Sequence, residues 1–395
     1  MLKSLENSRY SMNLIKQKKT ILLLFMTIFV MNGFAHDDIS EKNTEKHDEI
    51  EHKEKAEKKF NAGEMIMHHV KDAHEIHFLT LNEGKKDEKH ISAYLPIILW
   101  DNGFKVFSSS HFYHNKKESH GHEYYEYNGY VMSHEKIYKA NSAGGIDLDE
   151  KHKVSNVKPL DLSITKSVLG LFISGIILLL IFIVVARSYK KRQGKAPKGL
   201  QNLMETLILF IRDEVAVPSI GAKKADKFMP FLLTLFFFIW IANILGLIPF
   251  LGGFNVMGTM SIALVLATVV FIITTINGNK HYWSHIMWPA GIPLPIKLIL
   301  VPIEIAGIFI KPAVLTIRLM ANITAGHIII LAFVSLIFIF KESGGAATGW
   351  AVSVGSMAFM IFINLIELLV AFLQAYVFTL LAALYFGGAV EEAHH

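Results

Sequence analysis

The chain contains no cysteine among its 395 residues, so neither disulfide bonds nor thiolate metal sites are available to it. Charged residues make up only 18% of the sequence and hydrophobic ones 52%, which is unusual for a soluble protein. There is no basic patch interleaved with aromatic residues, and this argues against nucleic acid as a partner. A Walker-type phosphate loop is also absent, so we expect no nucleotide chemistry from this chain. We predict that it has no cofactor and is not an enzyme by itself.

What charge there is lies unevenly along the chain. Residues 36–160 hold fourteen of the nineteen histidines and most of the acids. Beyond Lys227 the Lys, Arg, Asp and Glu residues are few: Lys280, Lys297, Glu304, Lys311, Arg318, Lys341, Glu342, Glu367, Glu391 and Glu392. The net charge of +5 is therefore an average over two unlike parts.

The N-terminus has the pattern of a secretory signal. Lysines at positions 16, 18 and 19 precede the short apolar run Ile21–Val30, and Gly33 and Ala35 are the small residues ahead of a cleavage site. The apolar run is too short to span a membrane comfortably. We predict that residues 1–35 are a signal peptide, with a retained anchor as the alternative.

Residues 36–160 are predicted to form a histidine-rich external domain. The first 25 or so are of mixed charge and nearly free of large apolar side chains, which is typical of disorder. Apolar patches follow at Ala73–Leu81 and Ile91–Trp100, and turn signals stand at Asn102-Gly103 and Asn128-Gly129. The pattern predicts a small β-containing domain.

Histidine-rich tracts can bind metals. His68, His69, His74 and His77 have spacings that a helix could bring to one face, and His111, His114, His120 and His122 form a second cluster. Neither shows a defined set of ligands. A weak metal site, proton buffering and a merely solvated domain therefore remain as alternatives, and the last is the simplest.

Residues 161–395 are predicted to be a membrane ion-channel domain. The apolar stretch Ile164–Ala186 is of spanning length, and six basic residues between 187 and 198 follow it. Under the positive-inside rule this places the external domain in the periplasm and the basic end in the cytoplasm. Gly199–Val217 is amphipathic and is predicted to lie at the membrane interface.

Four further apolar stretches complete the predicted fold. Phe228–Phe250 and Met257–Ile276 are ordinary spans, whereas Pro293–Phe340 and Ala351–Gly387 are too long for perpendicular helices. We predict that the two long stretches form a tilted antiparallel hairpin turned at Lys341–Thr348. The fold class is thus an all-α polytopic membrane protein of about five spans, with a cytoplasmic C-terminus.

Polar residues inside the apolar stretches form two stripes. Glu304, Lys311 and Arg318 are spaced by seven residues, which drift by only about 20° per step on a helix. Asn322 extends this stripe by one turn.

On the last stretch, Asn364, Glu367 and Gln374 share a second face. When the two stripes face each other, His327 has Glu367 as an obvious partner.

A charged group at a helix centre costs about 2.5–3.5 kcal/mol, so each one needs a reason. Snorkelling or a structural pair is a sufficient reason for Lys311 alone, and simple packing for His327 alone. Two aligned stripes are better explained by a water-filled proton path. The guanidinium of Arg318 stays protonated, so it blocks a proton rather than relays it. A fixed cation between two aqueous paths acts as a gate.

These residues resemble subunit a of the F-type ATP synthase over roughly residues 160–390. The most specific segment is Pro312–Ile328 (PAVLTIRLMANITAGHI), with Arg318 matching the family's essential arginine. Trp240–Pro249 (WIANILGLIP), which contains Asn243, resembles the second-span signature, and Asn364–Tyr376 resembles the last helix.

The resemblance implies roles for these residues. Arg318 would face a rotating ring of c subunits and separate two half-channels. Glu304 matches a residue of the cytoplasmic half-channel, and the outer half-channel positions are matched by Asn322, His327, Glu367 and Gln374. Lys311, Asn243 and Asn364 are supporting residues. His327 and Glu367 are exchanged relative to many bacterial members, which suggests that they act jointly.

The implied partners are the c ring, the b-subunit peripheral stalk, the rest of the ATP synthase and membrane lipid, in a bacterial inner membrane. A sodium-translocating version of the same subunit and an ion-coupled secondary transporter are the alternatives. A metal-responsive receptor is a third, although it predicts few polar residues within the membrane. No internal repeat of the kind found in transporters is present.

Overall fold

The computed structural model describes residues 62–81, 89–119, 122–149, 153–248, 253–289 and 291–392. The predicted signal peptide (1–35) and the predicted disordered segment (36–60) lie outside these residues. The described chain forms two units. The N-terminal unit contains residues 68–173 and 245–256, and the helical unit contains the other described residues.

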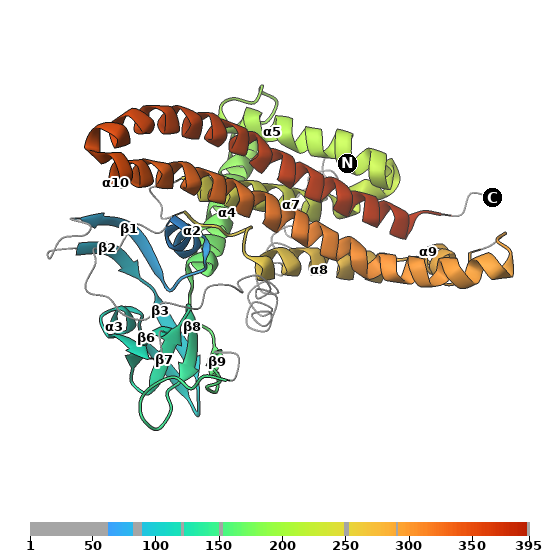
Figure 1. The fold of residues 1–395 in the computed structure, drawn as a ribbon. Coiled ribbons are helices and arrows are strands. Elements are labelled where there is room, and N and C mark those ends of the chain that lie inside the picture. Colours follow the sequence, from blue (N-terminus) through green and yellow to red (C-terminus); the bar gives the residue numbers. More distant parts are fainter. Residues whose placement is uncertain are drawn as a thin grey trace. The chain divides into compact units, whose positions relative to one another are not determined.

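The N-terminal unit is built from three antiparallel sheets (Figure 1). The strands are β1 (Glu75–Leu81), β2 (Lys89–Tyr94), β3 (Pro96–Trp100), β4 (Phe104–Ser108), β5 (Lys116–Ser119), β6 (His122–Tyr127), β7 (Tyr130–Ser133), β8 (Lys136–Lys139) and β9 (Leu160–Asp161). They pair in the orders β1-β2, β4-β3-β9 and β5-β6-β7-β8. The short helix α3 (Ser110–Tyr113) follows β4, and α2 (Ala62–Val70) precedes β1.

The turn signals in the sequence fall where the strands reverse. Asn102-Gly103 joins β3 to β4, and Asn128-Gly129 joins β6 to β7. Asn128 and Gly129 both have positive φ, of 51° and 79°. A two-residue turn with positive φ at both positions matches the twist of a β-hairpin, and Asn-Gly is its preferred sequence.

Alternation along β3 builds the main core of this unit. Ile97 and Leu99 are fully buried and pack with Phe112 of α3 and Tyr130 and Met132 of β7. The neighbouring residues of β3 point to the opposite face, because side chains alternate along a strand.

Helices account for nearly all of the helical unit. They are α4 (Lys166–Lys191), which begins in the N-terminal unit, then α5 (Leu200–Phe210), the π-helix η1 (Ile211–Ala216), α6 (Val217–Ile220), α7 (Ala222–Leu247), α8 (Met260–Asn277), α9 (Lys280–Met287) and α10 (Leu294–Val390). Among the described residues, α4, α7, α8 and α10 are long and apolar enough to cross a membrane. These ranges overlap the predicted spans.

Two connections between the long helices contain further helical structure. The amphipathic segment Gly199–Val217 is helical, and it includes the π-helix η1, which buries Ile211 and Val215. The connection after α8 contains the helix α9. Asn279 starts α9, because its side chain accepts a hydrogen bond from the Tyr282 amide at 2.7 Å.

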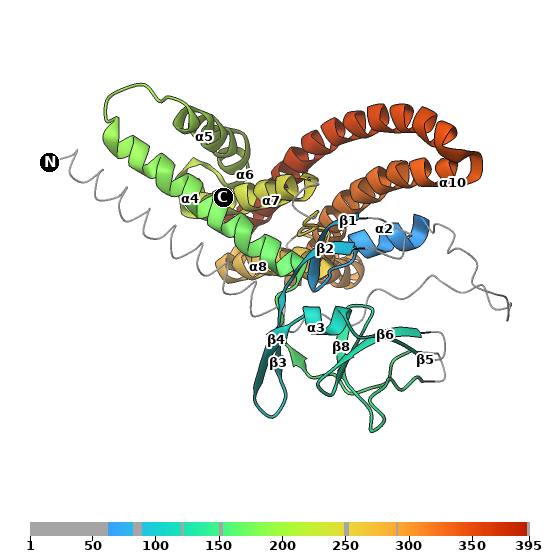
Figure 2. The same ribbon diagram turned by 90° about the vertical axis from the view of Figure 1, so that its left-hand side faces the viewer.

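The helix α10 folds back on itself as an antiparallel hairpin (Figures 1 and 2). The helix is broken at Gly345, whose φ of 80° and ψ of −176° are not helical. The hydroxyl of Thr348 closes the turn by donating to the carbonyls of Phe340 and Gly345. This confirms the predicted turn at Lys341–Thr348. Residues 294–344 are called the first arm below, and residues 346–390 the second arm.

Contacts between the arms set their register. The rings of Phe333 and Phe359 stack at 4.7 Å between centroids. The far end of the second arm is bonded to neighbouring helices. Lys224 Nζ donates to the carbonyl of Val390 at 2.7 Å, and the Asn279 amide donates to the carbonyl of Ala389 at 2.9 Å.

Candidate functional site

The predicted gate, Arg318, lies on an exposed face of the first arm. The face is otherwise largely apolar: Val314 is 46% exposed and Ile317 is 53% exposed. Asn322, one turn further along, is exposed as well. Among the residues that the structure describes, Arg318 makes no ion pair. Its charge is therefore presented outward from an apolar surface.

A cavity of about 100 Å³ lies at Lys311, which precedes Arg318 on the first arm. The polar groups around this cavity are called the first polar level below. It is lined from α8, α9 and both arms of α10, and Lys311, Tyr385, Tyr282 and Thr274 supply its polar groups. The Nζ atom of Lys311 is 5.7 Å from the centre of the Tyr385 ring, which is close enough for a cation–π contact. The lysine is thus held by an aromatic ring from the second arm.

The charge of Glu304 lies near the same end of the hairpin as the cavity. It is half-buried, seven residues before Lys311. Burial raises the pKa of the Tyr282 hydroxyl on α9, and the negative charge of Glu304 raises it further. Glu304 and the Tyr282 side of the cavity are therefore electrostatically coupled.

The second polar level lies beyond Arg318, where Glu367 of the second arm meets the first. The carboxylate of Glu367 occupies the space next to the backbone of Gly326 that a Cβ atom would otherwise fill. Gly326 immediately precedes His327, which is half-buried. The structure therefore brings Glu367 to the turn of helix that carries its predicted partner.

The remaining predicted residues of this level are held by α7 and by α10 itself. Gln374 is buried, and Asn243 of α7 donates from Nδ2 to the carbonyl of Ala371 at 3.3 Å. Asn364 donates to the carbonyl of Met360 in its own helix at 3.0 Å. Asn364 is therefore bonded within its own helix and not to the described residues of the first arm.

Several polar atoms on the helices around this level have no protein partner. Within the described residues, the buried atoms without a hydrogen-bond partner include Trp240 Nε1, Asn243 Oδ1, Thr324 Oγ1 and Glu367 Oε2. Buried polar groups are nearly always hydrogen-bonded, and each exception needs an explanation.

Sequence reasoning missed two residues of this arrangement. Tyr385 faces Lys311 across the hairpin, and Gly326 makes room for Glu367. Tyr385 stands eighteen residues after Glu367, which is about five full helical turns, so the periodicity contained the signal for Tyr385. Gly326 gave no such signal, because a close approach between two arms is a tertiary contact.

The helical face predicted for the first histidine cluster does not exist. His74 precedes β1 and His77 lies within it, so the two cannot share a helix with His68 and His69 of α2. The side chains of His68 and His69 lie outside the described part of the structure. Across the described residues, no group of three His, Cys, Asp or Glu side chains is placed to hold a metal ion.

The second histidine cluster is also spread over different elements. His111 lies on α3, His114 follows that helix, and His122 begins β6. His120 is outside the described residues.

Comparison with known proteins gives two family matches. Residues 168–387, more than half of the chain, match the family model described as ATP synthase A chain. Residues 65–162 match a second model, described as a domain of unknown function (DUF8433).

Curated relatives agree with the first match. The sequence is 44% identical to ATP synthase subunit a of Chloroherpeton thalassium, over 60% of this chain and 69% of the relative. It is 45% identical to ATP synthase subunit a 2 of Chlorobaculum tepidum, over 60% and 66%. A more distant relative, ATP synthase subunit a of Anaeromyxobacter dehalogenans, is 35% identical over 68% of each chain. The chain therefore belongs to the family of ATP synthase A chains.

Proposed function

We propose that the chain is the proton-translocating stator subunit of the Fo sector, in which two half-channels separated by Arg318 serve a ring of c subunits. Membership of the family makes it a non-catalytic, ion-translocating Fo subunit in a bacterial membrane, associated with the rest of the ATP synthase. The c ring and the b-subunit peripheral stalk are the partners that we propose for direct contact.

The position of Arg318 between two polar levels carries this proposal. At about 1.5 Å per residue, Arg318 lies about 10 Å along the first arm from Lys311 and its cavity. It lies about 12 Å from Gly326, where Glu367 packs. Because Arg318 is exposed on an apolar face, its guanidinium is available to a partner's carboxylate rather than to a group in this chain.

The proposed cycle follows from these positions. A proton enters through His327 and Glu367, with Gln374 and Asn322 beside the path, and neutralises a c-subunit carboxylate that then turns into lipid. A second carboxylate meets Arg318. A neighbouring cation lowers a carboxylate pKa by about 1–3 units, so this carboxylate releases its proton. The proton leaves past Lys311 and Glu304, driven by about 2.3 kcal/mol per 100 mV.

The buried polar atoms without protein partners support a hydrated path. Trp240, Asn243 and Glu367 come from α7 and the second arm, which pack against each other. Unsatisfied groups of this kind are costly in an apolar interior, whereas a path lined by water and titratable groups gives them partners. A structural salt bridge would pair Glu367 alone and would leave Trp240 and Asn243 without partners.

We further propose five membrane crossings, with the two arms of α10 counted separately. The N-terminal unit then lies in the periplasm and the C-terminus in the cytoplasm, as the basic residues after α4 predict. The alternative of a secondary transporter has no support from the family match.

Proton pumping by an Arg318→Ala variant tests the proposal. In vesicles that carry the assembled complex, we expect ATP-driven pumping to fall to background, because no fixed cation then separates the half-channels. Lys341→Ala is the matched control, since Lys341 is an exposed cation at the hairpin turn and away from the proposed path. Co-purification of the c ring shows that assembly survives.

Pumping by Arg318→Ala at the rate of the Lys341→Ala control would contradict the gate. The same vesicles separate protons from sodium. We expect pumping that does not depend on added sodium, and pumping that requires sodium would assign the chain to the sodium-translocating version instead.

A further inference from the structure

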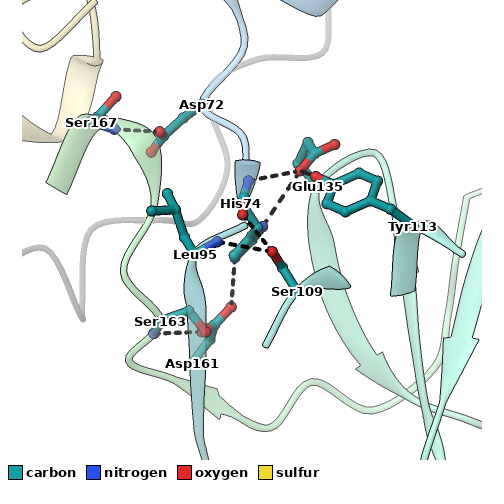
Figure 3. Close-up of polar contacts among 9 residues, drawn as sticks. All are labelled: Asp72, His74, Leu95, Ser109, Tyr113, Glu135, Asp161, Ser163 and Ser167. Carbon is teal, nitrogen blue, oxygen red and sulfur yellow. Dashed lines mark hydrogen bonds and ion pairs between the residues drawn. The ribbon is translucent and has the colours of Figure 1, made fainter. Parts of the chain in front are cut away.

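A buried histidine that the proposed proton path does not use lies in the N-terminal unit. His74 is only 2% exposed (Figure 3). Its main-chain amide donates to Glu135 Oε2 at 3.2 Å, and its ring Nδ1 is 3.5 Å from the same oxygen. On the other side its Nε2 is 4.0 Å from Asp161 Oδ2, and this nitrogen has no hydrogen-bond partner among the described residues. The ring thus lies between two carboxylates.

Glu135 reaches His74 from an unusual turn. His134 and Glu135 form the two-residue turn between β7 and β8, with φ values of 50° and 64°. The matching turn between β6 and β7 uses Asn128-Gly129, the preferred sequence for this geometry. Left-handed backbone costs most residues energy, and such strain persists where the surrounding structure requires it. Here the turn directs the carboxylate at His74 and at the hydroxyl of Tyr113, which donates to it at 2.9 Å.

The segment around His74 is also bonded to the first turn of α4. The amide of Ser167 donates to Asp72 Oδ1 at 2.8 Å, and the amide of Lys166 donates to the carbonyl of Ala73 at 2.9 Å. The first amides of a helix have no partner within the helix, so these acceptors complete the start of α4. Residues 72–74 therefore hold the N-terminus of a predicted membrane span.

The same segment is bonded to the residue that follows β2 and to the residue that precedes α3. The carbonyl of His74 accepts the hydroxyl of Ser109 at 2.7 Å and the amide of Leu95 at 3.0 Å. Any movement of His74 away from Glu135 therefore strains bonds that come from several elements.

The charges that face His74 favour its protonated form. Burial lowers the pKa of His74, but the hydrogen bond to Glu135 and the charges of Asp161, Glu135 and Asp72 outweigh burial and raise the pKa above its ordinary value. Burial likewise raises the pKa of Glu135, and its bonds to His74 and Tyr113 reverse this and lower it. The buried ammonium of Lys166, at the start of α4, interacts with Asp72 and Glu135 and balances part of the negative charge.

We propose that His74 is a proton-binding site that closes a clasp, within the N-terminal unit, between residues 72–74 and the first turn of α4. With the proton bound, both ring nitrogens are donors, Nδ1 toward Glu135 and Nε2 toward Asp161. Without it, one nitrogen loses its hydrogen and the carboxylates lose a balancing charge. Residues 72–74 are then held less tightly, and their hydrogen bonds to the amides of Lys166 and Ser167 are weakened.

The pH window follows from the two shifts. Because the pKa of His74 is raised by folding, its stabilisation is complete below the ordinary value of 6.5 and is lost as pH rises through the raised value. Because the pKa of Glu135 is lowered, its contribution is lost only in acid, as pH falls through the lowered value. The clasp is thus closed at mildly acidic pH and opens toward alkaline pH. On the proposed orientation, the clasp lies on the side of the membrane from which protons enter.

Hydrogen–deuterium exchange of the full chain in its purified complex tests the clasp. Protection of peptides covering residues 71–77 and 163–170 is measured from about pH 5 to about pH 9, which brackets the ordinary histidine pKa, and is corrected for the intrinsic rate. We expect protection to fall with rising pH, by up to about tenfold per pH unit between the ordinary and the raised pKa. His74→Gln removes this dependence, whereas His114→Gln, an exposed position in the same unit, keeps it.

Asp161→Asn keeps the test decisive if His74→Gln unfolds the unit. Removing the charge near Nε2 shifts the midpoint of the protection change to lower pH while preserving side-chain size. A wild-type profile that is flat with pH, or an Asp161→Asn midpoint equal to that of the wild type, would overturn the proposal. The same profile is expected in the Arg318→Ala complex, so failure of the clasp and failure of the proposed proton path are separable.

Discussion

The two units of this chain treat charged groups in opposite ways. In the N-terminal unit, His74 is enclosed by Glu135 and Asp161, and the surrounding hydrogen bonds converge on one segment. In the helical unit, Arg318 is exposed on an apolar face and makes no ion pair with the described residues. A cluster of opposite charges fixes one arrangement of the chain, whereas a charged group without an opposite charge beside it remains able to meet a partner.

Backbone geometry shows the same contrast. The N-terminal unit accepts a strained His-Glu turn to place a carboxylate. The helical unit places its carboxylate without strain, by using glycine at the contact between arms. Small residues let membrane helices approach closely. Gly326 makes room for Glu367 because it has no side chain, whereas the β7–β8 turn places Glu135 through its backbone conformation.

Among the substitutions that test this comparison, Gly326→Ala is expected to have the largest effect, a loss of proton pumping. The added Cβ takes the space of the Glu367 carboxylate, and overpacking of this kind costs about 1–3 kcal/mol. We expect ATP-driven proton pumping in vesicles to fall by at least about fivefold while the complex still assembles. Gly355→Ala is the matched control, because a Cβ there meets nothing within 4 Å. Equal pumping by the two variants would mean that the position of Glu367 does not matter.

A smaller effect is expected from Glu135→Ala in the N-terminal unit. The change leaves His74 and the hydroxyl of Tyr113 without their shared partner, at a cost of about 1–3 kcal/mol. Chemical denaturation of the full chain, followed by exchange protection of β7 and β8, measures this loss. Glu118→Ala, at an exposed position in β5, is expected to change nothing measurable. A Glu135→Ala midpoint equal to that of Glu118→Ala would show that the cluster is not a stabilising one.

The smallest effect is expected from Asp72→Ala. It removes the acceptor for the Ser167 amide at the start of α4, which is worth about 1 kcal/mol for a capping side chain. Asp72→Asn retains an oxygen acceptor and should lose less. Exchange protection of residues 163–170 separates the two variants, and an identical loss in both would assign the effect to charge rather than to the hydrogen bond.

Most of the membrane fold could be predicted from hydropathy. The spans and the hairpin turn at Lys341–Thr348 could be predicted because a bilayer requires long apolar helices, and a length excess requires a tilt or a break. The stripes that contain Arg318 and Glu367 followed from helical periodicity. The structure places Glu367 against Gly326, the residue next to its predicted partner His327, although that glycine and Tyr385 were not foreseen.

The clasp at His74 could not be predicted in the same way. Asp72 and Ser167 are separated by 95 positions in the sequence, and no local pattern announces such a contact. The His134-Glu135 turn lacks the Asn-Gly signal that marked the neighbouring hairpin. The four histidines that suggested a helical metal face lie on different elements, because strand β1 and not a helix follows Asp72. Local propensity was overruled here by tertiary contacts.

The bonds at the far end of the hairpin also have a mechanical consequence. The arms are joined covalently through the turn at Gly345, and the second arm is bonded at its other end to Lys224 and Asn279. A beam supported at both ends bends far less under a sideways load than one clamped at a single end. The second arm is held in this way at both ends, so force that reaches it is passed to α7 and α9 instead of bending that arm.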